Sequence, residues 1–181
     1  MSRQYLFFLF SFPLLISGCG PKPAKPVKPP ARVETVKPVD PYSIDTAKAQ
    51  QLMRSGNPQE AAEIYRKLAA SPSSHQNRFR LLAADALLQS GNVAEAKANT
   101  DAIDPGTLSA QQRSQLNLIH AQINLSSGSA EKAIQYLDLI PAHQLNSKDR
   151  VTYHQSRAFA YSLTGQLLKS AEERILISDL I

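Results

Sequence analysis

The chain has 181 residues, which is enough for one ordinary domain with appended segments but not for two full-sized domains. It lacks tryptophan, contains only 7% aromatic residues and is rich in helix-favouring residues through its second half, which argues against an all-β fold. The formal net charge is +5, but residues 43–181 hold 14 basic and 13 acidic side chains, so no basic face for a nucleic acid is expected.

Residues 1–18 have the layout of a secretory signal peptide. Arg3 supplies a positive charge near the start, an apolar run extends from Tyr5 to Ile16, and the small residues Ser17 and Gly18 follow. The apolar run is about twelve residues long, shorter than the roughly 20 that a permanent transmembrane helix needs. We therefore predict a leader that is removed.

Cys19 is the only cysteine in the chain, so a disulfide within the chain is excluded. Residues 15–19, LISGC, resemble the lipobox of bacterial lipoproteins. The resemblance implies that Cys19 becomes the first mature residue and carries lipid, and each buried methylene contributes about 0.8 kcal/mol to membrane attachment. Gly20 follows in place of an aspartate, which by the same resemblance implies the outer membrane, with the mature chain facing the periplasm.

Residues 19–42 are predicted to form a flexible tether. The stretch GPKPAKPVKPPARVETVKPVDPY contains seven prolines, four lysines, one arginine and two acids, and it can form neither a helix nor a central strand. In polyproline II geometry, at about 3.1 Å per residue, it would reach roughly 70 Å. A simple spacer is favoured over a recognition motif for a proline-binding partner.

Residues 43–181 contain a repeat marked by four glycines, separated by 35, 37 and 37 residues. Each glycine has an alanine seven residues before it and a small residue five residues after it. Glycine tolerates the positive φ at which a helix often ends, and small residues let two helices approach closely. We predict an all-α solenoid of about four helical hairpins. The repeated positions are Gly56, Gly91, Gly128 and Gly165, with Ala49, Ala84, Ala121 and Ala158 before them and Ala61, Ala96, Ala133 and Ser170 after them.

Helix starts and interior positions fit the same register. Polar residues followed three positions later by Glu or Gln predict helix N-caps at Asn57, Asn92 and Ser109. Large apolar residues are expected to fill the interior, namely Leu52, Tyr65, Leu68, Leu87, Ile103, Leu137, Ile140, Tyr161 and Ile177.

The stretches KAQQLMRSGNPQEAAEIYRKLAASP and RLLAADALLQSGNVAEAKA resemble the tetratricopeptide repeat, and the resemblance extends over about residues 43–181. The match is degenerate, because the early aromatic of the first helix is replaced by Asp45, Arg80, Asn117 and His154, and two linkers carry extra residues. The resemblance implies an inner groove, lined by the first helix of each pair, that would suit an extended peptide or another protein's loop. Ordinary solvated helix surface is an equally open reading. The implied groove residues are Gln50, Met53, Arg78, Asp85, Gln89, Gln115, Gln122, Gln155 and Phe159.

No catalytic or metal-binding pattern is evident, so we predict a non-enzyme without cofactor or metal. The four histidines have neither i, i+4 spacing nor neighbouring acidic ligands, and His120 is expected to be a partly buried repeat residue. Glu172 and Glu173 are expected on a solvated, ion-paired helix face.

The end of the chain, ERILISDLI, is apolar and has no polar capping helix. Ile177, Leu180 and Ile181 are therefore expected to dock onto another domain or a partner, or else the chain is a fragment. The stretch RVTYHQSRAFAYSLTGQLLKSAEERILISDLI, combined with the lipobox, the tether and the repeats, resembles the amino-terminal half of the LppC/LpoA family. These are outer-membrane lipoproteins that activate class A penicillin-binding proteins, and in the family an α/β domain that is held to contact the synthase follows the repeats. The resemblance therefore implies that this chain is the tethered repeat domain and that the C-terminal α/β domain is missing from it.

The resemblance implies a non-catalytic, outer-membrane-anchored repeat domain that regulates a peptidoglycan synthase. The alternative is a generic repeat lipoprotein that scaffolds another envelope assembly, such as outer-membrane protein insertion or pilus secretion, because the fold alone does not distinguish partners. A third class, a wall hydrolase, would require a buried carboxylate pair in a cleft.

Overall fold

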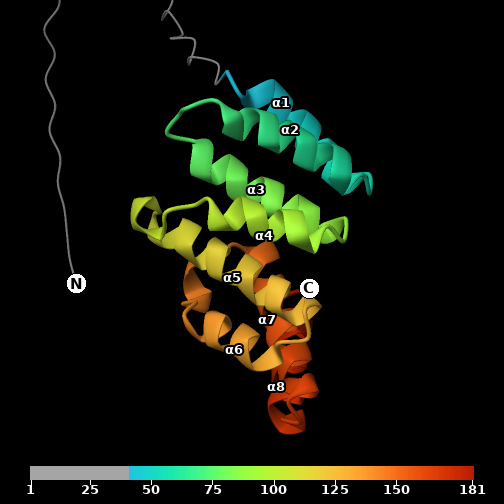
Figure 1. Cartoon of the computed structure of the whole chain (residues 1–181). Helices are drawn as coiled ribbons and strands as arrows, with labels where there is room; N and C mark the ends of the chain where they lie inside the picture. The colour runs from blue at the N-terminus through green and yellow to red at the C-terminus, as the bar shows by residue number, and fades with distance from the viewer. Residues whose placement is uncertain (1–40) are drawn as a thin grey trace, which may run out of the picture. The chain divides into compact units, whose positions relative to one another are not determined.

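The computed structural model describes residues 41–181, so the expected signal peptide, Cys19 and most of the tether lie outside the described residues. Within residues 41–181 the chain forms eight α-helices and two short 3-10 helices, with no strands (Figure 1). The all-α repeat prediction is therefore confirmed. The elements are α1 Ser43–Arg54, α2 Pro58–Ala70, α3 Gln76–Gln89, α4 Val93–Asp101, η1 Pro105–Thr107, α5 Ala110–Ser126, α6 Ala130–Asp138, η2 Ala142–Gln144, α7 Ser147–Leu163 and α8 Leu167–Ser178.

The helices pair as four hairpins, and each hairpin turns at one of the four predicted glycines. Gly56, Gly91, Gly128 and Gly165 have φ angles of +80°, +82°, +74° and +73°. In each turn the N–H of the residue after the glycine donates to the carbonyl five residues earlier, as from Asn92 to Leu87 at 2.8 Å. This is the Schellman arrangement, in which a left-handed residue closes the helix end. A Cβ at these glycines would meet nothing within 4 Å, so the backbone conformation alone requires glycine there.

Helices α2, α4 and α5 begin directly after the predicted N-cap residues Asn57, Asn92 and Ser109, but the capping chemistry differs among them. Ser109 and Gln112 form the expected reciprocal capping box at the start of α5. Asn57 and Asn92 precede α2 and α4 without a side-chain cap. The Asn92 amide instead donates to Gln59 and Ser90. The prediction of side-chain caps at Asn57 and Asn92 was wrong, because each of these residues also closes the preceding helix and adopts that turn's backbone.

Small residues lie at the helix crossings, as the repeat register predicts. The alanines before and after the glycines are at most 4% exposed, and Ser170 is 5% exposed. The Ser170 hydroxyl donates to the Ala158 carbonyl at 2.8 Å, so the one departure from alanine is hydrogen-bonded where α7 and α8 meet. Close approach of the paired helices follows from these side chains.

Two buried clusters form the core, and α5 contributes to both. Leu116, Ile119 and Ile123 join the cluster built mainly from α1 to α4, while Leu118 and Ala121 join the cluster of α6 and α7. Successive hairpins are therefore connected through one helix, as in other repeat arrays. Of the predicted interior residues, Leu52 and Ile177 are only half-buried and the others are buried.

The two ends of the described region differ in packing. Tyr42, expected in the tether, packs edge-on against Phe79 with ring centroids 5.3 Å apart. At the other end Ile177 and Leu180 are half-buried and Ile181 is exposed. Docking of these three residues onto another domain stays a prediction. No helix in the described part of the chain is long and apolar enough to cross a membrane.

A candidate binding trough along the first helices

The first helix of each hairpin contributes equivalent positions to one face of the stack. Gln50, Asp85, Gln122 and Phe159 are separated by the same 35, 37 and 37 residues as the glycines. A groove of about 430 Å³ crosses α1, α3, α5 and the start of α7. A shallower hollow of about 360 Å³ between α5 and α7 shares two lining residues, Gln122 and Thr152, with that groove. We call the two together the trough.

Most of the groove residues implied by the sequence meet in the trough. Gln155 and Phe159 line its second hollow, which Gln122 shares. Arg78 lines neither part; it is exposed on α3, seven residues before Asp85. The first part is lined by six of the implied residues, namely Gln50, Met53, Asp85, Gln89, Gln115 and Gln122.

The trough has an apolar floor that the sequence reasoning did not identify. Tyr65 of α2 and the side chains Leu81, Leu118 and Ile119 line it and are buried. The paired apolar residues at 81–82 and 118–119 of the first helices carried a signal for such a floor. Tyr65 carried none, because from the sequence it was indistinguishable from an ordinary interior residue of the second helix.

Tyr65 retains a neutral phenol at the trough. Burial raises the pKa of Tyr65, the nearby Asp85 charge raises it further, and the Arg78 charge opposes both effects. No hydrogen bond of the Tyr65 hydroxyl is present among residues 41–181. A neutral hydroxyl of this kind can donate and accept a hydrogen bond to a ligand.

Both carboxylates of the trough are engaged by neighbouring side chains. Asp85 accepts hydrogen bonds from Lys148 Nζ and Gln89 Nε2, each at 3.0 Å. Asp149 accepts one from Gln115 at 3.2 Å and one from Asn146 at 2.7 Å. The Lys148–Asp85 pair also joins α7 to α3, so it connects the fourth hairpin to the second.

Three other polar side chains of the lining make no hydrogen bond or ion pair with the described residues. The side chains of Gln50, Arg54 and Gln122 have no hydrogen-bond or ion-pair partner within the part of the chain that the structure describes. Each glutamine amide offers two donors and an acceptor, and the guanidinium offers five donors. The trough therefore presents hydrogen-bonding groups to a ligand, and its two charged side chains without an ion-pair partner among the described residues, Arg54 and Asp149, have opposite signs.

The trough becomes apolar at its last hairpin. Phe159 occupies the position of Gln122 one repeat earlier, and Leu163 occupies the position of Ser126. Both apolar side chains are 52% exposed. Because residues four apart lie on one helix face, Phe159 and Leu163 form a short apolar strip on α7.

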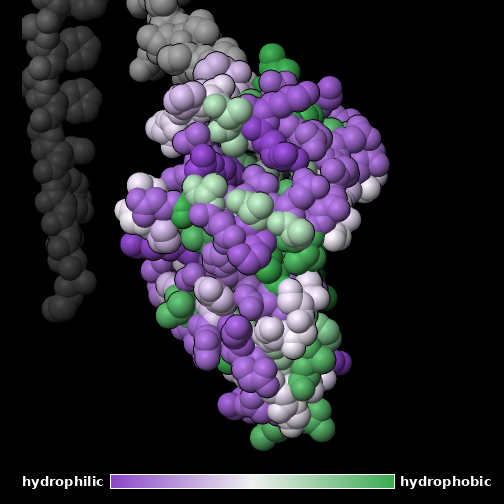
Figure 2. All heavy atoms as spheres, viewed as in Figure 1, coloured by the Kyte–Doolittle hydropathy of each residue, from purple (hydrophilic) through white to green (hydrophobic). Residues whose placement is uncertain are grey.

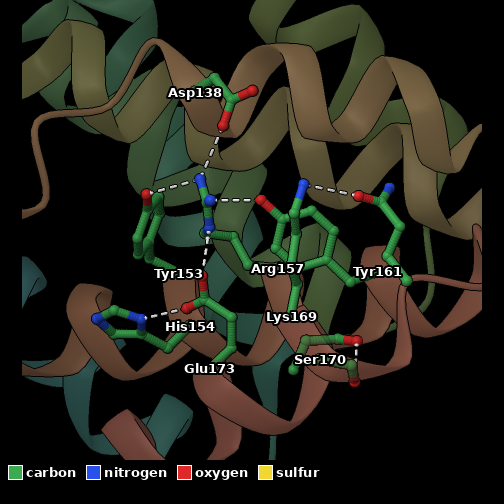
Figure 3. A network of polar contacts seen from close by, with 10 residues as sticks. Asp138, Tyr153, His154, Arg157, Tyr161, Lys169, Ser170 and Glu173 are labelled. Atoms are coloured by element: carbon green, nitrogen blue, oxygen red, sulfur yellow. Dashed lines mark hydrogen bonds and ion pairs between the residues drawn. The ribbon is translucent and has the colours of Figure 1, made fainter.

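A second cluster of polar side chains lies between α7 and α8 and is largely buried, except for the exposed Asp138 of α6. Glu173 accepts hydrogen bonds from Arg157 Nε at 2.7 Å and His154 Nδ1 at 2.6 Å (Figure 3). Arg157 also donates to Asp138 at 2.8 Å and to the hydroxyls of Tyr153 and Tyr161. The network therefore links α6, α7 and α8.

Glu173 does not lie on the solvated face expected from the sequence. It is 8% exposed, so that expectation was wrong, although Glu173 is ion-paired as expected. Burial by itself lowers the pKa of Arg157, but the hydrogen bond to Glu173 and the neighbouring charges outweigh it, and the net effect raises the pKa. Arg157 therefore stays charged and must be balanced by Glu173 and Asp138.

The buried network has a structural role, because its hydrogen bonds hold α6, α7 and α8 together. Each Glu173 oxygen accepts a hydrogen bond from a side chain of α7. His120 stacks on Tyr136 with ring centroids 5.1 Å apart and is half-buried, as expected. No group of three His, Cys, Asp or Glu side chains within residues 41–181 is placed to hold a metal ion.

The network coincides with the stretch that resembles the LppC/LpoA family, since Tyr153, His154, Arg157, Tyr161 and Glu173 all belong to it. A family model described as "LppC putative lipoprotein" matches residues 56–181, which include most of the trough and the whole network. No curated protein and no solved structure matches the chain. With more than half of its length covered by this family model, the chain belongs to the LppC lipoprotein family.

Proposed function

We propose that the chain is a non-catalytic lipoprotein, held by lipid on Cys19 at the periplasmic side of the outer membrane, that binds and regulates a class A penicillin-binding protein. The observation that carries this proposal is the LppC family match over residues 56–181. The lipobox at residues 15–19 and the continuous trough support it from the chain itself.

Each part has a physical role in this proposal. The lipid fixes the chain at one membrane, while the synthase acts on peptidoglycan some distance away. A proline-rich tether spans distance without folding, because proline disfavours helix and favours extended backbone. The stacked hairpins then present a rigid trough, and a preformed site binds without a large ordering cost.

Reconstituted synthesis tests the proposal. The full mature chain carrying Cys19→Ser, which stays in solution, is added to a purified class A penicillin-binding protein with its lipid-linked substrate. We expect the two proteins to co-purify and the rate of glycan polymerisation or cross-linking to rise as the chain is titrated. A chain with Glu131→Lys, a change on an exposed position of α6, should stimulate equally.

Absence of both binding and stimulation would contradict the proposal. It would favour the scaffold of another envelope assembly, since that reading predicts no effect on a synthase. Hydrolysis of peptidoglycan by the chain alone would instead contradict the non-catalytic part.

A further inference from the structure

The lining of the larger part of the trough carries no net charge. Its charged side chains are Arg54, Asp85, Lys148 and Asp149, two of each sign. Lys148 pairs with Asp85 at 3.0 Å, which leaves Arg54 and Asp149 as charges of opposite sign without an ion-pair partner among the described residues. Charges that cancel within a site favour neither an anion nor a cation. A ligand that complements this part of the trough is therefore neutral overall.

Each carboxylate of this lining keeps one oxygen free to accept a hydrogen bond. Lys148 and Gln89 both donate to the Oδ2 atom of Asp85. The two side-chain amides that contact Asp149 likewise both donate to its Oδ2 atom. Neither Oδ1 atom accepts a hydrogen bond from any of residues 41–181, and each of the three amides has a second hydrogen to donate. A ligand group at these positions must donate to a carboxylate and accept from an amide, which a hydroxyl group does.

The polar groups surround an apolar floor. Gln50 of α1, Gln89 of α3, Gln122 of α5 and Thr152 of α7 all line this part of the trough, so the rim is drawn from the first helix of every hairpin. The floor beneath it is made of Tyr65, Leu81, Leu118 and Ile119, which are buried. A ligand that fills this arrangement needs a less polar face and hydrogen-bonding groups around its whole perimeter.

A sugar ring has this distribution, because its hydroxyl groups project from the ring edge while C–H groups cover its faces. An extended peptide fits less well, since its backbone groups lie along two edges and its side chains cover both faces. The volume of about 430 Å³ lies within the range of ordinary ligand sites, roughly 300–1,000 Å³. The chemistry of the lining therefore favours a saccharide.

The amides of the rim select the kind of saccharide. A carboxamide pairs with an acetamido group by donating one hydrogen bond and accepting another, and the acetamido methyl group can rest on the apolar floor. We propose that the larger part of the trough binds a neutral saccharide that carries acetamido groups. Five lining side chains are carboxamides, namely Gln50, Gln89, Gln115, Gln122 and Asn146.

Tyr65 supplies a further hydrogen-bonding group to this ligand. Within residues 41–181 the one fully buried side-chain nitrogen or oxygen without a hydrogen bond is Arg150 Nε, so the unpartnered Tyr65 hydroxyl is not sealed in the core. Because Tyr65 lines the trough, its hydroxyl is available to a saccharide there.

The inference goes beyond the proposed function and leaves a separate surface for it. The shallower hollow of the trough, between α5 and α7, includes Phe159, which is 52% exposed. An exposed aromatic side chain of this kind suits a protein partner. The saccharide is assigned to the α1, α3 and α5 side, and the protein partner to the hollow beside Phe159.

Ligand-observed saturation-transfer NMR with defined disaccharides tests the inference. The probe is N,N′-diacetylchitobiose, and its counterparts are chitobiose, in which amines replace the acetamido groups, and cellobiose, in which hydroxyls replace them. The protein is the full mature chain carrying Cys19→Ser. We expect the acetylated disaccharide to bind most tightly, with an affinity that changes little with salt because the ligand is neutral.

Two substitutions place the ligand in the trough. Tyr65→Phe removes only a hydroxyl and should weaken binding about fivefold, the effect of one hydrogen bond. Gln50→Leu, at an exposed position, should weaken it by a similar factor without altering the melting curve. Tyr136→Phe is the matched control, because Tyr136 lies on α6 outside the lining, and this variant should bind as the parent does.

No transfer to the acetylated disaccharide, or binding of cellobiose or chitobiose as tight as that of the probe, would overturn the inference. Unchanged binding by both Tyr65→Phe and Gln50→Leu would overturn it as well. Tighter binding of the acetylated hexasaccharide than of the disaccharide would support it with a glycan chain as the ligand, and equal binding would support it with a free sugar. Saccharide binding without effect on a synthase refutes only the proposed function, and stimulation without saccharide binding refutes only the inference.

Discussion

Replacing Glu173 with leucine is expected to destabilise the last hairpin by about 3 kcal/mol, because removal of one partner from a buried ion pair leaves the other charge uncompensated. Arg157 would lose its contact at 2.7 Å, and His154 would lose its contact at 2.6 Å. Asp138 still contacts Arg157, which places the expected loss at the lower end of the usual range. Urea unfolding followed by circular dichroism measures the change.

Glu172 provides a matched control for this substitution. It precedes Glu173 on α8 but is exposed and makes no ion pair among the described residues. Glu172→Leu should therefore change the free energy of unfolding by no more than about 0.5 kcal/mol. Combining Glu173→Leu with Arg157→Met should recover part of the loss, since an apolar pair of similar volume can replace a buried ion pair. Equal effects at positions 172 and 173 would show that the network does not hold α8.

The loss of stability caused by Glu173→Leu should also be confined to the last hairpin. In a stack of repeats each hairpin contacts mainly its neighbours, and the Lys148–Asp85 pair that joins the fourth hairpin to the second is largely exposed, so damage to the last hairpin should spread weakly. Hydrogen exchange should accelerate in α7 and α8 while the amides of α1 and α2 keep their protection. Uniform acceleration throughout residues 41–181 would mean that the hairpins unfold as a single unit and that the network acts globally.

Replacing Cys19 with serine is expected to abolish lipidation and release the chain from the membrane. A serine hydroxyl cannot form the thioether that the lipobox resemblance implies. A single short acyl chain holds a protein only marginally, whereas several chains make attachment effectively stable, so removal of all of them is a large effect. Metabolic labelling with palmitate and fractionation of cells measure both consequences.

Ser17→Ala is the matched control for Cys19→Ser, because it keeps a small residue in the lipobox and leaves the thiol in place. Its labelling and membrane fraction should equal those of the parent chain. Continued membrane partitioning of the Cys19→Ser chain would contradict the anchor and would require another attachment to the envelope.

The fold could be predicted from the sequence because its signal is periodic. Four glycines at a nearly constant interval, with small residues at two fixed offsets, specify where each hairpin turns and where its helices cross. The positive φ at Gly56 depends on the residue being glycine. The burial of Ala49 depends on its small size and on its spacing from that glycine. Such local requirements survive in the sequence even where the repeat's usual aromatic position is lost.

The polar details could not be predicted in the same way. Glu172 and Glu173 are adjacent glutamates, so the sequence gives no reason to choose between them. Only the rotation of α8 about its axis relative to α7 decides which of the two contacts Arg157. Asn57 and Asn92 look like helix caps, but the turn that precedes each one sets its backbone. Side-chain pairing depends on the relative placement of helices, which spacing alone does not specify.

The candidate trough was only partly predictable. The amide-bearing positions follow from the repeat register, whereas the floor includes Tyr65 from a second helix and the rim includes Lys148 from the start of the fourth hairpin. Lys148 reaches Asp85 across 63 residues of sequence. Arg78 shares the register but lies outside the lining, because the trough begins about one turn further along α3.

The apolar surface at the end of the stack is a separate feature. Figure 2 shows a largely hydrophilic face with apolar side chains exposed at several places, among them the end where α8 lies. Leu168, Ile175 and Leu176 of α8 are exposed, more so than the half-buried Ile177 and Leu180 that the sequence suggested for docking. Docking at this end stays a prediction, and α8 adds these exposed apolar residues to those that the sequence suggested for it.

Site-specific photo-cross-linking in cells tests most directly whether a partner is bound through the trough. A photoreactive phenylalanine is placed at Gln122, which lines both parts of the trough, or at Lys132, an exposed position of α6. We predict a cross-link to a class A penicillin-binding protein from position 122 and none from position 132. A cross-link from position 132 alone would contradict the assignment of partner binding to the trough.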